Sequence, residues 1–345
     1  MKLQLAVLLA GVALAVAGPL HEPSRDTHGA QVLRVKVTDL ADLRYLAYLQ
    51  SRTTLDFWTE PRALGEIDIM ARRWDLPMLK AALQHRNLQY SVQIANVHRH
   101  LADLKERHLQ ARTKAGDSRM SWDAYYNYDE INAWLDSLAA EYPSIATVTD
   151  VGTSYEGRTM KLLKLSTGGT GKDAIFTDGG IHAREWIAPA TVTYFIQQLV
   201  AGDGVGLLDS VDFYFMPAIN PDGYAYTFTD VSPKFCHHAV HHAFHQSLWT
   251  LADSLANAAV AALTAVHGTQ YKVGSSTNTI YIAAGGSDDW ALGVGGSEYA
   301  YTIELRDEGQ YGFRLPESLI IPTAEETWAG FKVVAQFIAD NPKPK

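Results

Sequence analysis

The stretch Gly179–Trp186, which reads Gly-Gly-Ile-His-Ala-Arg-Glu-Trp, decides how the rest of this 345-residue chain is interpreted. It follows an apolar segment, residues 174–178, that has the pattern of a buried strand. Two glycines then lead to His182 and Glu185, three residues apart. Imidazole and carboxylate are ligands that a catalytic zinc often uses, and such a site keeps one position open for water. The alternative is a polar turn after a buried strand, because His-x-x-Glu also arises by chance.

The composition is that of a folded, acidic protein. Hydrophobic residues make up 47% of the chain and charged residues 19%, and the formal net charge is -9. These values favour a globular protein over a disordered one, and the length suits one large domain with a smaller one. The sequence has no basic stripe, so we expect no nucleic-acid partner.

The first 18 residues have the features of a secretory signal peptide. Met1–Gly18 contains one lysine, an apolar run from Leu3 to Val16, and small residues at its end. The run is short for a membrane span, and no later stretch is long and apolar enough for one. We therefore expect a secreted, extracellular protein without a membrane partner. A lone cysteine, Cys236, is unusual in such a protein and indicates a free thiol, an intermolecular bond or a missing partner.

Residues 19–119 are predicted to form a removable pro-domain. Alternating and helical patterns follow one another in the order β-α-β-β-α-β, which predicts a small α+β unit with helices on one face of an antiparallel sheet. No group of residues in this region would carry chemistry. Arg112, Lys114 and Arg119 stand in a polar link where an extracellular trypsin-like protease would cut.

Residues 120–345 are predicted to form an α/β domain with a mixed central sheet and helices on both faces. Sites in such sheets lie at the carboxyl ends of strands, where His182 and Glu185 fall. Tyr299–Leu305 is predicted to be a late strand. Thr323 and Glu326 have the spacing of a capping box that would begin the last helix.

Four motifs together resemble one family, the zinc metallocarboxypeptidases of the pancreatic A/B type. The motifs are Gly-Ile-His-Ala-Arg-Glu-Trp at 180–186, Asn-Pro-Asp-Gly-Tyr at 220–224, Ile-Tyr-x-Ala-x-Gly-Gly-Ser-x-Asp-Trp at 280–290, and Glu-Leu-Arg-Asp-x-Gly-x-Tyr-Gly-Phe at 304–313. The N-terminal β-α-β-β-α-β segment resembles the activation peptide of these enzymes. The resemblance covers nearly the whole secreted chain, apart from roughly Val231–Gln246.

The resemblance implies zinc as the cofactor and assigns roles to several residues. His182 and Glu185 match two zinc ligands, and Arg184 matches a basic residue beside the substrate-binding cleft. Glu304 matches the general base that activates the attacking water together with zinc, a role that suits a carboxylate near the metal. The alternative for Glu304 is a salt bridge with Arg306.

The resemblance also implies how substrate is recognised. Tyr281 matches a mobile tyrosine that covers bound substrate, although it could equally be a core tyrosine. Asp288 matches the base of the side-chain pocket, where an acid is typical of B-type enzymes, which remove C-terminal lysine or arginine. A partly buried carboxylate pairs with a guanidinium or ammonium group and rejects an apolar side chain. The alternative is that Asp288 and Asp289 are two solvated loop acids.

The chain departs from the family after Asp222-Gly223. Family members have a long central segment there, which supplies the third zinc ligand in a His-Ser-Tyr motif, an Asn-Arg pair for the substrate carboxylate, another catalytic arginine and usually a disulfide. Here Val231–Gln246 stands in its place, and the sequence contains neither motif. Cys236 fits the loss of a disulfide partner. The catalytic domain is therefore predicted to be shortened near residues 231–246.

A histidine-rich tract occupies this shortened region: His237, His238, His241, His242 and His245. On a helix, the first, third and last of these would share one face, so one could supply the missing ligand, or the tract could bind metal by itself. The simpler interpretation is a junction made by deletion or alternative splicing, whose histidines coordinate nothing, because a third ligand needs a specific place in the sheet.

Two hypotheses of different classes follow. The first is a secreted, monomeric zinc carboxypeptidase zymogen that a trypsin-like protease activates and that acts on peptide or protein C-termini. The second is a catalytically impaired or inactive family member that at most binds peptides or partners. A third possibility is that the pro-domain alone inhibits related enzymes.

Overall fold

The computed structural model describes residues 27–343, with gaps at 60, 62–63, 116–119, 229–242, 246–250, 280–284, 308–310 and 312–314. The chain divides into two compact units, and the boundary between them falls at Lys114 and Ala115. The C-terminal unit holds Ala115–Ala225 and Val240–Lys345. The predicted signal peptide lies outside the described residues, so that assignment stays a prediction.

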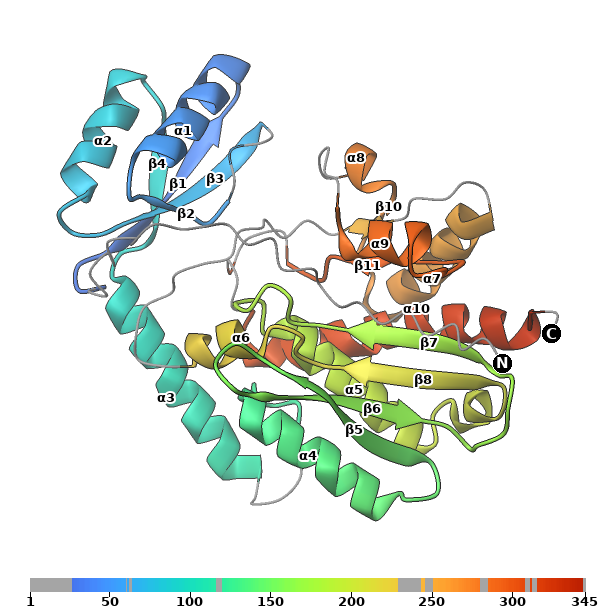
Figure 1. The fold of residues 1–345 in the computed structure, drawn as a ribbon. Helices are drawn as coiled ribbons and strands as arrows, with labels where there is room; N and C mark the ends of the chain where they lie inside the picture. The colour runs from blue at the N-terminus through green and yellow to red at the C-terminus, as the bar shows by residue number, and fades with distance from the viewer. Residues whose placement is uncertain are drawn as a thin grey trace. The chain divides into compact units, whose positions relative to one another are not determined.

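The N-terminal unit has the predicted order of elements and an antiparallel sheet of order β2-β3-β1-β4 (Figure 1). Leucines at helical spacing on α1 and α2 pack on the alternating apolar residues of the central strands. Arg34 and Asp68 face each other across the sheet, with 2.7 Å between the guanidinium and the carboxylate. The elements are β1 (Gln31–Val37), α1 (Leu40–Arg52), β2 (Asp56–Phe57), β3 (Gly65–Ala71), α2 (Leu76–His85), β4 (Tyr90–Ile94) and α3 (Val97–Ala115).

The larger sheet of the C-terminal unit is mixed, as predicted. Its order is β5-β6-β8-β7, in which β7 runs parallel to β8 and the other pairs are antiparallel. The parallel pair aligns Asp178 with Met216, so both strands end at the same edge. These strands are β5 (Ala146–Thr153), β6 (Thr159–Leu165), β7 (Asp173–Asp178) and β8 (Val211–Met216).

Three helices bury the apolar residues of this sheet. They are α4 (Tyr128–Glu141), α5 (Ile187–Ala201) and α10 (Ile320–Asp340). Phe213 and Phe215 on β8 are fully buried, and Phe331 of α10 lies in ring contact with Phe213 and with Phe195 of α5. A capping box between Asn127 and Glu130 begins α4. Burial of these large side chains is the main contribution to the stability of the unit.

A second, smaller sheet has the order β10-β9-β11, with β9 parallel to β10 and antiparallel to β11. Among the described residues, no strand pairing joins it to the larger sheet. Of the predicted strand Tyr299–Leu305, Thr302 and Ile303 form the described strand, paired with His245 and Phe244 of β9. The remaining elements are η1 (Val205–Asp209), α6 (Pro221–Thr227), β9 (Ala243–His245), α7 (Leu251–His267), β10 (Lys272–Gly274), α8 (Ser276–Thr279), α9 (Ser287–Gly293), β11 (Thr302–Ile303) and η2 (Glu317–Leu319).

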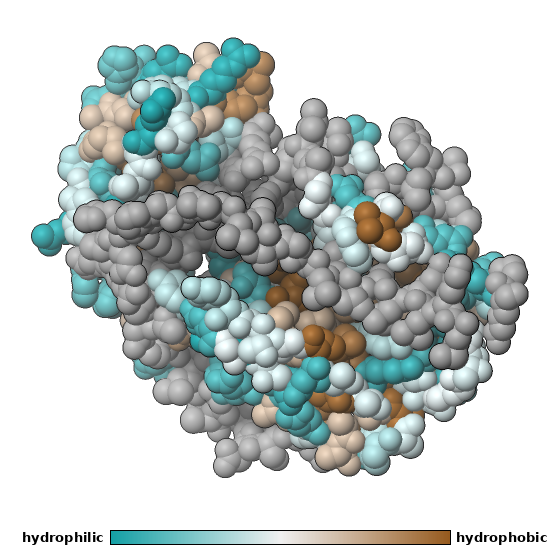
Figure 2. Space-filling view, in the orientation of Figure 1, coloured by the Kyte–Doolittle hydropathy of each residue, from teal (hydrophilic) through white to brown (hydrophobic). Residues whose placement is uncertain are grey.

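The exposed apolar residues are scattered over the described surface. Exposed large apolar residues such as Leu40, Tyr155 and Val294 come from separate parts of the chain, and on the face drawn in Figure 2 brown residues stand in small groups among teal and white ones. Within the described ranges, no helix combines the length and the apolar character that crossing a membrane requires.

The predicted capping box at Thr323 and Glu326 is wrong. Helix α10 begins three residues earlier, at Ile320, and the Thr323 hydroxyl donates to the Leu319 carbonyl. Glu326 is fully buried and accepts hydrogen bonds from Arg306 at 2.8 Å and from the Thr269 hydroxyl at 2.7 Å. The carboxylate therefore ties the segment after β11 to α10, which a signature of local spacing cannot reveal.

We expect Glu326→Gln to lower the free energy of unfolding by about 3 kcal/mol, because it removes the charge that compensates the largely buried Arg306. Urea denaturation of the full chain measures this. Glu325→Gln is the matched control: this neighbouring carboxylate is 42% exposed and pairs with His267, so its loss should cost less than about 1 kcal/mol. Equal losses from the two variants would contradict the importance of the buried pair.

Candidate metal and substrate site

The site is built on the loop that leaves β7. A Cβ at Gly179 would lie 3.0 Å from the Pro217 carbonyl oxygen, so the close approach of two backbones requires glycine there. Gly180 has φ +68°, and a Cβ would also meet Pro189 at 3.0 Å. Backbone bonds Gly179 N–H to Met216 O and Ile219 N–H to Gly179 O then hold the ends of β7 and β8 together.

His182 and Glu185 lie side by side in the turn that follows. The imidazole Nδ1 and the carboxylate Oε2 are 3.1 Å apart, and the Glu185 N–H donates to the His182 carbonyl. Both side chains are partly exposed, 27% and 16%. Burial lowers the pKa of His182, but the hydrogen bond and charge of Glu185, with the charge of Glu304, raise it overall.

Glu304 follows β11 and is electrostatically coupled to the same two residues. Burial raises its pKa to about 8, repulsion from Glu185 adds to the rise, and His182 opposes it. The alternative considered for Glu304, a salt bridge with Arg306, does not form, because Arg306 is bonded to Glu326. The structure therefore brings together three of the predicted site residues: His182, Glu185 and Glu304.

Arg184 is buried, with 5% of its surface exposed, and its charge lowers the pKa of His182. It lies within the site loop rather than at the surface. A carboxyl group at the end of β7, Asp178, has a pKa raised to about 6 by burial.

Asp288 and Asp289 have different surroundings on α9. The Asp289 carboxylate accepts from the backbone N–H groups of Gly285 and Gly286, at 2.9 and 3.2 Å, and so caps the helix. Asp288 is partly buried and makes no hydrogen bond or ion pair with another residue that the structure describes. The two acids are therefore not equivalent loop residues.

Tyr281, Cys236 and the histidines from 237 to 242 lie outside the described residues. His245 ends β9, where its backbone is in register with Thr302 of β11. In the described part of the chain, no group of three His, Cys, Asp or Glu residues could hold a metal ion. The third ligand that the sequence left open is therefore not identified.

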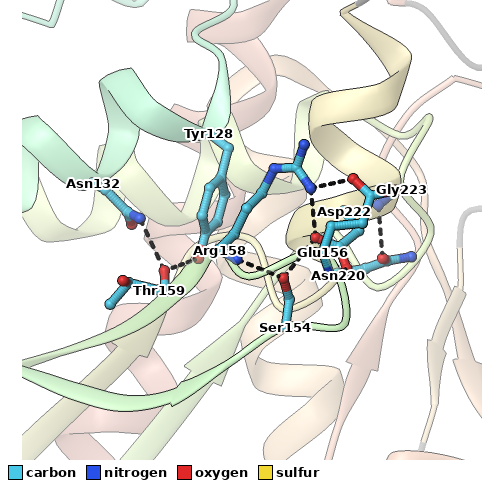
Figure 3. Close-up of polar contacts among 9 residues, drawn as sticks. All are labelled: Tyr128, Asn132, Ser154, Glu156, Arg158, Thr159, Asn220, Asp222 and Gly223. Atoms are coloured by element: carbon cyan, nitrogen blue, oxygen red, sulfur yellow. Dashed lines mark hydrogen bonds and ion pairs between the residues drawn. The ribbon is translucent and has the colours of Figure 1, made fainter.

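A polar network beside the site was missed by the sequence reasoning (Figure 3). Asp222 on α6 accepts from the Ser154 hydroxyl at 2.6 Å, from the Glu156 N–H at 3.0 Å, and from Arg158. These contacts fasten the β5–β6 turn to the start of α6. The available signal was the Asn-Pro-Asp-Gly run at 220–223, which we had used only for recognition of the family.

The comparisons define the class of protein. The family model described as zinc carboxypeptidase matches residues 131–251 and 241–330, and the carboxypeptidase activation peptide model matches residues 33–103. The chain therefore belongs to the zinc carboxypeptidase family, the metallocarboxypeptidases, which are hydrolases, and it carries an activation peptide.

Individual relatives agree with this assignment. The chain is 48% identical to carboxypeptidase B of Astacus astacus, over 64% of this chain and 99% of that protein. It is 31% identical to human carboxypeptidase B, over 97% of this chain and 99% of the relative. The crystal structure of carboxypeptidase A from Helicoverpa armigera superposes with a TM-score of 0.79 at 21% sequence identity. The match covers 92% of this chain and 99% of that one, and it shows that the two share a fold.

The same comparisons locate the shortened region. The alignment to human carboxypeptidase B runs over 421 positions but uses 97% of 345 residues, so about 86 positions have no residue in this chain. The two pieces of the family match meet at residues 241–251. This junction lies between β8 and α7, and no strand pairing in the described part of the chain joins the two sheets across it.

Membership of the family implies zinc, and two side chains of this site have a geometry that fits the ion. Two donors on a tetrahedral zinc with bonds of about 2.1 Å stand about 3.4 Å apart, close to the 3.1 Å between His182 Nδ1 and Glu185 Oε2. The pair fits two positions of a zinc site. The described residues do not supply a third.

The raised pKa of Glu304 predicts how stability depends on pH. Because the folded state holds this proton up to about pH 8 while the unfolded state releases it near 4.5, the folded state binds more protons between these values. The free energy of unfolding of chelator-treated protein should fall as pH rises through this window, by an amount on the order of 4 kcal/mol for Glu304. Urea denaturation at several pH values measures it.

Glu304→Gln should flatten that part of the profile, since the amide does not titrate. Glu317→Gln is the control, because this residue lies on η2 and should leave the slope unchanged. A wild-type profile that rises between pH 5 and 8 would contradict the raised pKa of Glu304.

Proposed function

We propose that the chain is the secreted zymogen of a B-type metallocarboxypeptidase that removes C-terminal lysine or arginine from peptides. The observation that carries the proposal is the placement of His182 and Glu185 side by side after β7, 3.1 Å apart, with Glu304 after β11 near enough for its charge to raise the pKa of His182. Met1–Gly18 would be the signal peptide, and residues 19–119 the pro-domain, released by a trypsin-like protease.

His182 and Glu185 would hold zinc, which when bound supplies a Lewis acid that lowers the pKa of water. Glu304 would take a proton from the attacking water and deliver it to the leaving amine when the peptide bond breaks. A general base works best with a pKa near the working pH, and burial already moves Glu304 in that direction. Arg184 would add positive charge beside the cleft, and Tyr281 would cover the bound substrate.

Asp288 would set the preference for basic residues. It is partly buried and has no ion-pair partner among the described residues, while Asp289 is engaged in capping α9. A partly buried carboxylate without a partner is stabilised by the charge of a lysine or arginine side chain of the substrate, because partial removal from water leaves its own charge uncompensated.

A second candidate function is favoured by a specific observation. About 86 aligned positions are missing, and the described residues neither join the two sheets nor supply a third metal donor. A chain in this state would be a catalytically impaired family member that binds peptide C-termini without cleaving them.

One experiment separates the two candidates. Purified full-length chain is treated with trypsin, its zinc content is measured by elemental analysis, and release of C-terminal arginine from a short peptide is followed. The proposed enzyme binds about one zinc per chain, turns over, and stops when a chelator is added. Glu304→Gln should retain the zinc and lose at least about 100-fold in kcat. No turnover with substoichiometric zinc would favour the impaired family member instead.

Asp288→Asn tests the specificity. Loss of the charge should reduce kcat/KM for peptides ending in arginine by about 100-fold, while peptides ending in leucine change little. The matched control is Asp289→Asn, which removes an equal charge from the helix cap and should leave the ratio of the two substrates unchanged. A ratio altered equally by both variants would contradict the role of Asp288.

A further inference from the structure

Asn220 occupies a junction between the two loops that end β7 and β8. Its side-chain amide Nδ2 donates to the Ile181 carbonyl at 3.1 Å, directly before His182. Its Oδ1 accepts from the Gly223 N–H at 3.1 Å, at the start of α6. One side chain therefore links the backbone of the loop of residues 179–186 to the first turn of a helix.

The tether acts at Ile181, the residue of the loop whose side chain packs least. Ile181 is 48% exposed, so its side chain contributes little to holding the loop in place. Its carbonyl, by contrast, is fixed by an amide that has both of its hydrogen-bonding ends in use. The Asn220 amide thus fixes the backbone immediately before His182, while the buried side chains of Ala183 and Arg184 hold the loop after it.

The other side of the loop is fixed by close contact with α6. A Cβ at Gly223 would stand 2.8 Å from the Ala183 Cβ and 2.7 Å from the Asn220 amide nitrogen. Gly223 thereby lets α6 approach the residue between His182 and Arg184. The helix itself is anchored by Asp222, through the bonds with Ser154 and Arg158 shown in Figure 3.

We infer that Asn220 is a positioning residue, which holds the backbone at Ile181 so that His182 and Glu185 keep the mutual placement needed to bind a metal ion. The part of the inference that concerns metal binding rests on the proposed function. The part that concerns the backbone, that Asn220 holds the loop of residues 179–186, does not. Substitution of a residue that orients a metal ligand typically weakens metal binding by 10- to 100-fold, although the residue itself does not touch the metal.

The test compares two equal substitutions in the full-length chain. Asn220→Asp keeps the acceptor for Gly223 but loses the donor to Ile181. Asn132→Asp is the matched control, because Asn132 Nδ2 also donates to a backbone carbonyl, that of Thr159 at 3.2 Å, on α4 and away from the loop. Hydrogen exchange of residues 179–186, zinc affinity by competition with a chelator, and the visible spectrum of the Co²⁺-loaded chain are measured for each.

We expect Asn220→Asp to raise the exchange rate over 179–186 about 10-fold and to weaken zinc binding by about 10- to 100-fold, with an altered Co²⁺ spectrum and a preserved melting temperature. Asn132→Asp should change none of these. Unchanged exchange in Asn220→Asp overturns the inference, as does an increase spread over the whole C-terminal unit. If the wild-type chain binds no zinc, the proposed function fails. The hydrogen exchange rate of residues 179–186 then tests by itself whether Asn220 holds the loop.

Discussion

The parallel pairing of β7 with β8 is the constraint on which the site depends. Its register sets Asp178 beside Met216, so the glycine loop and the Asn-Pro-Asp-Gly turn leave the sheet at the same point. Backbone bonds between Gly179 and both Met216 and Ile219 continue the pairing past the strand ends. Two loops that are 40 residues apart in sequence thus support each other, and His182 and Glu185 take their places on one of them.

Glu304 reaches the site by a different route. It follows β11, which belongs to the second sheet, and no described strand spans the distance to β7. Its position depends instead on the packing of α7 against α10 and on the buried bond between Arg306 and Glu326. The half of the site on β7 is therefore held by strand pairing, and the half with Glu304 by helices. About 86 positions of the human relative have no counterpart in this chain. The loop after β7 and the segment with Glu304 do not depend on one another for support, so each can form without the missing residues.

The sequence predicted the parts whose signals are local. Alternation and helical spacing were enough for the N-terminal unit. His182, Glu185 and Glu304 were predicted from motifs of contiguous residues, and their roles stay predictions. The failures involve partners distant in sequence. Glu326 had the local spacing of a cap, but a buried arginine 20 residues away formed the stronger interaction. The bond of Ser154 to Asp222 spans 68 residues, and no periodic pattern encodes it.

The charges at the site explain why a cation would be favoured there. Burial and repulsion between Glu185 and Glu304 keep a proton on Glu304, and the two carboxylates together raise the pKa of His182. A divalent cation bound by His182 and Glu185 would favour loss of the protons on His182 and Glu304. The ion needs the neutral imidazole as a ligand, and its charge relieves the repulsion between Glu185 and Glu304. Metal and proton thus compete for the His182 imidazole. The ordering of the loop by Asn220 matters for this competition, because a proton tolerates a displaced ligand and a metal ion, with its fixed bond lengths, does not.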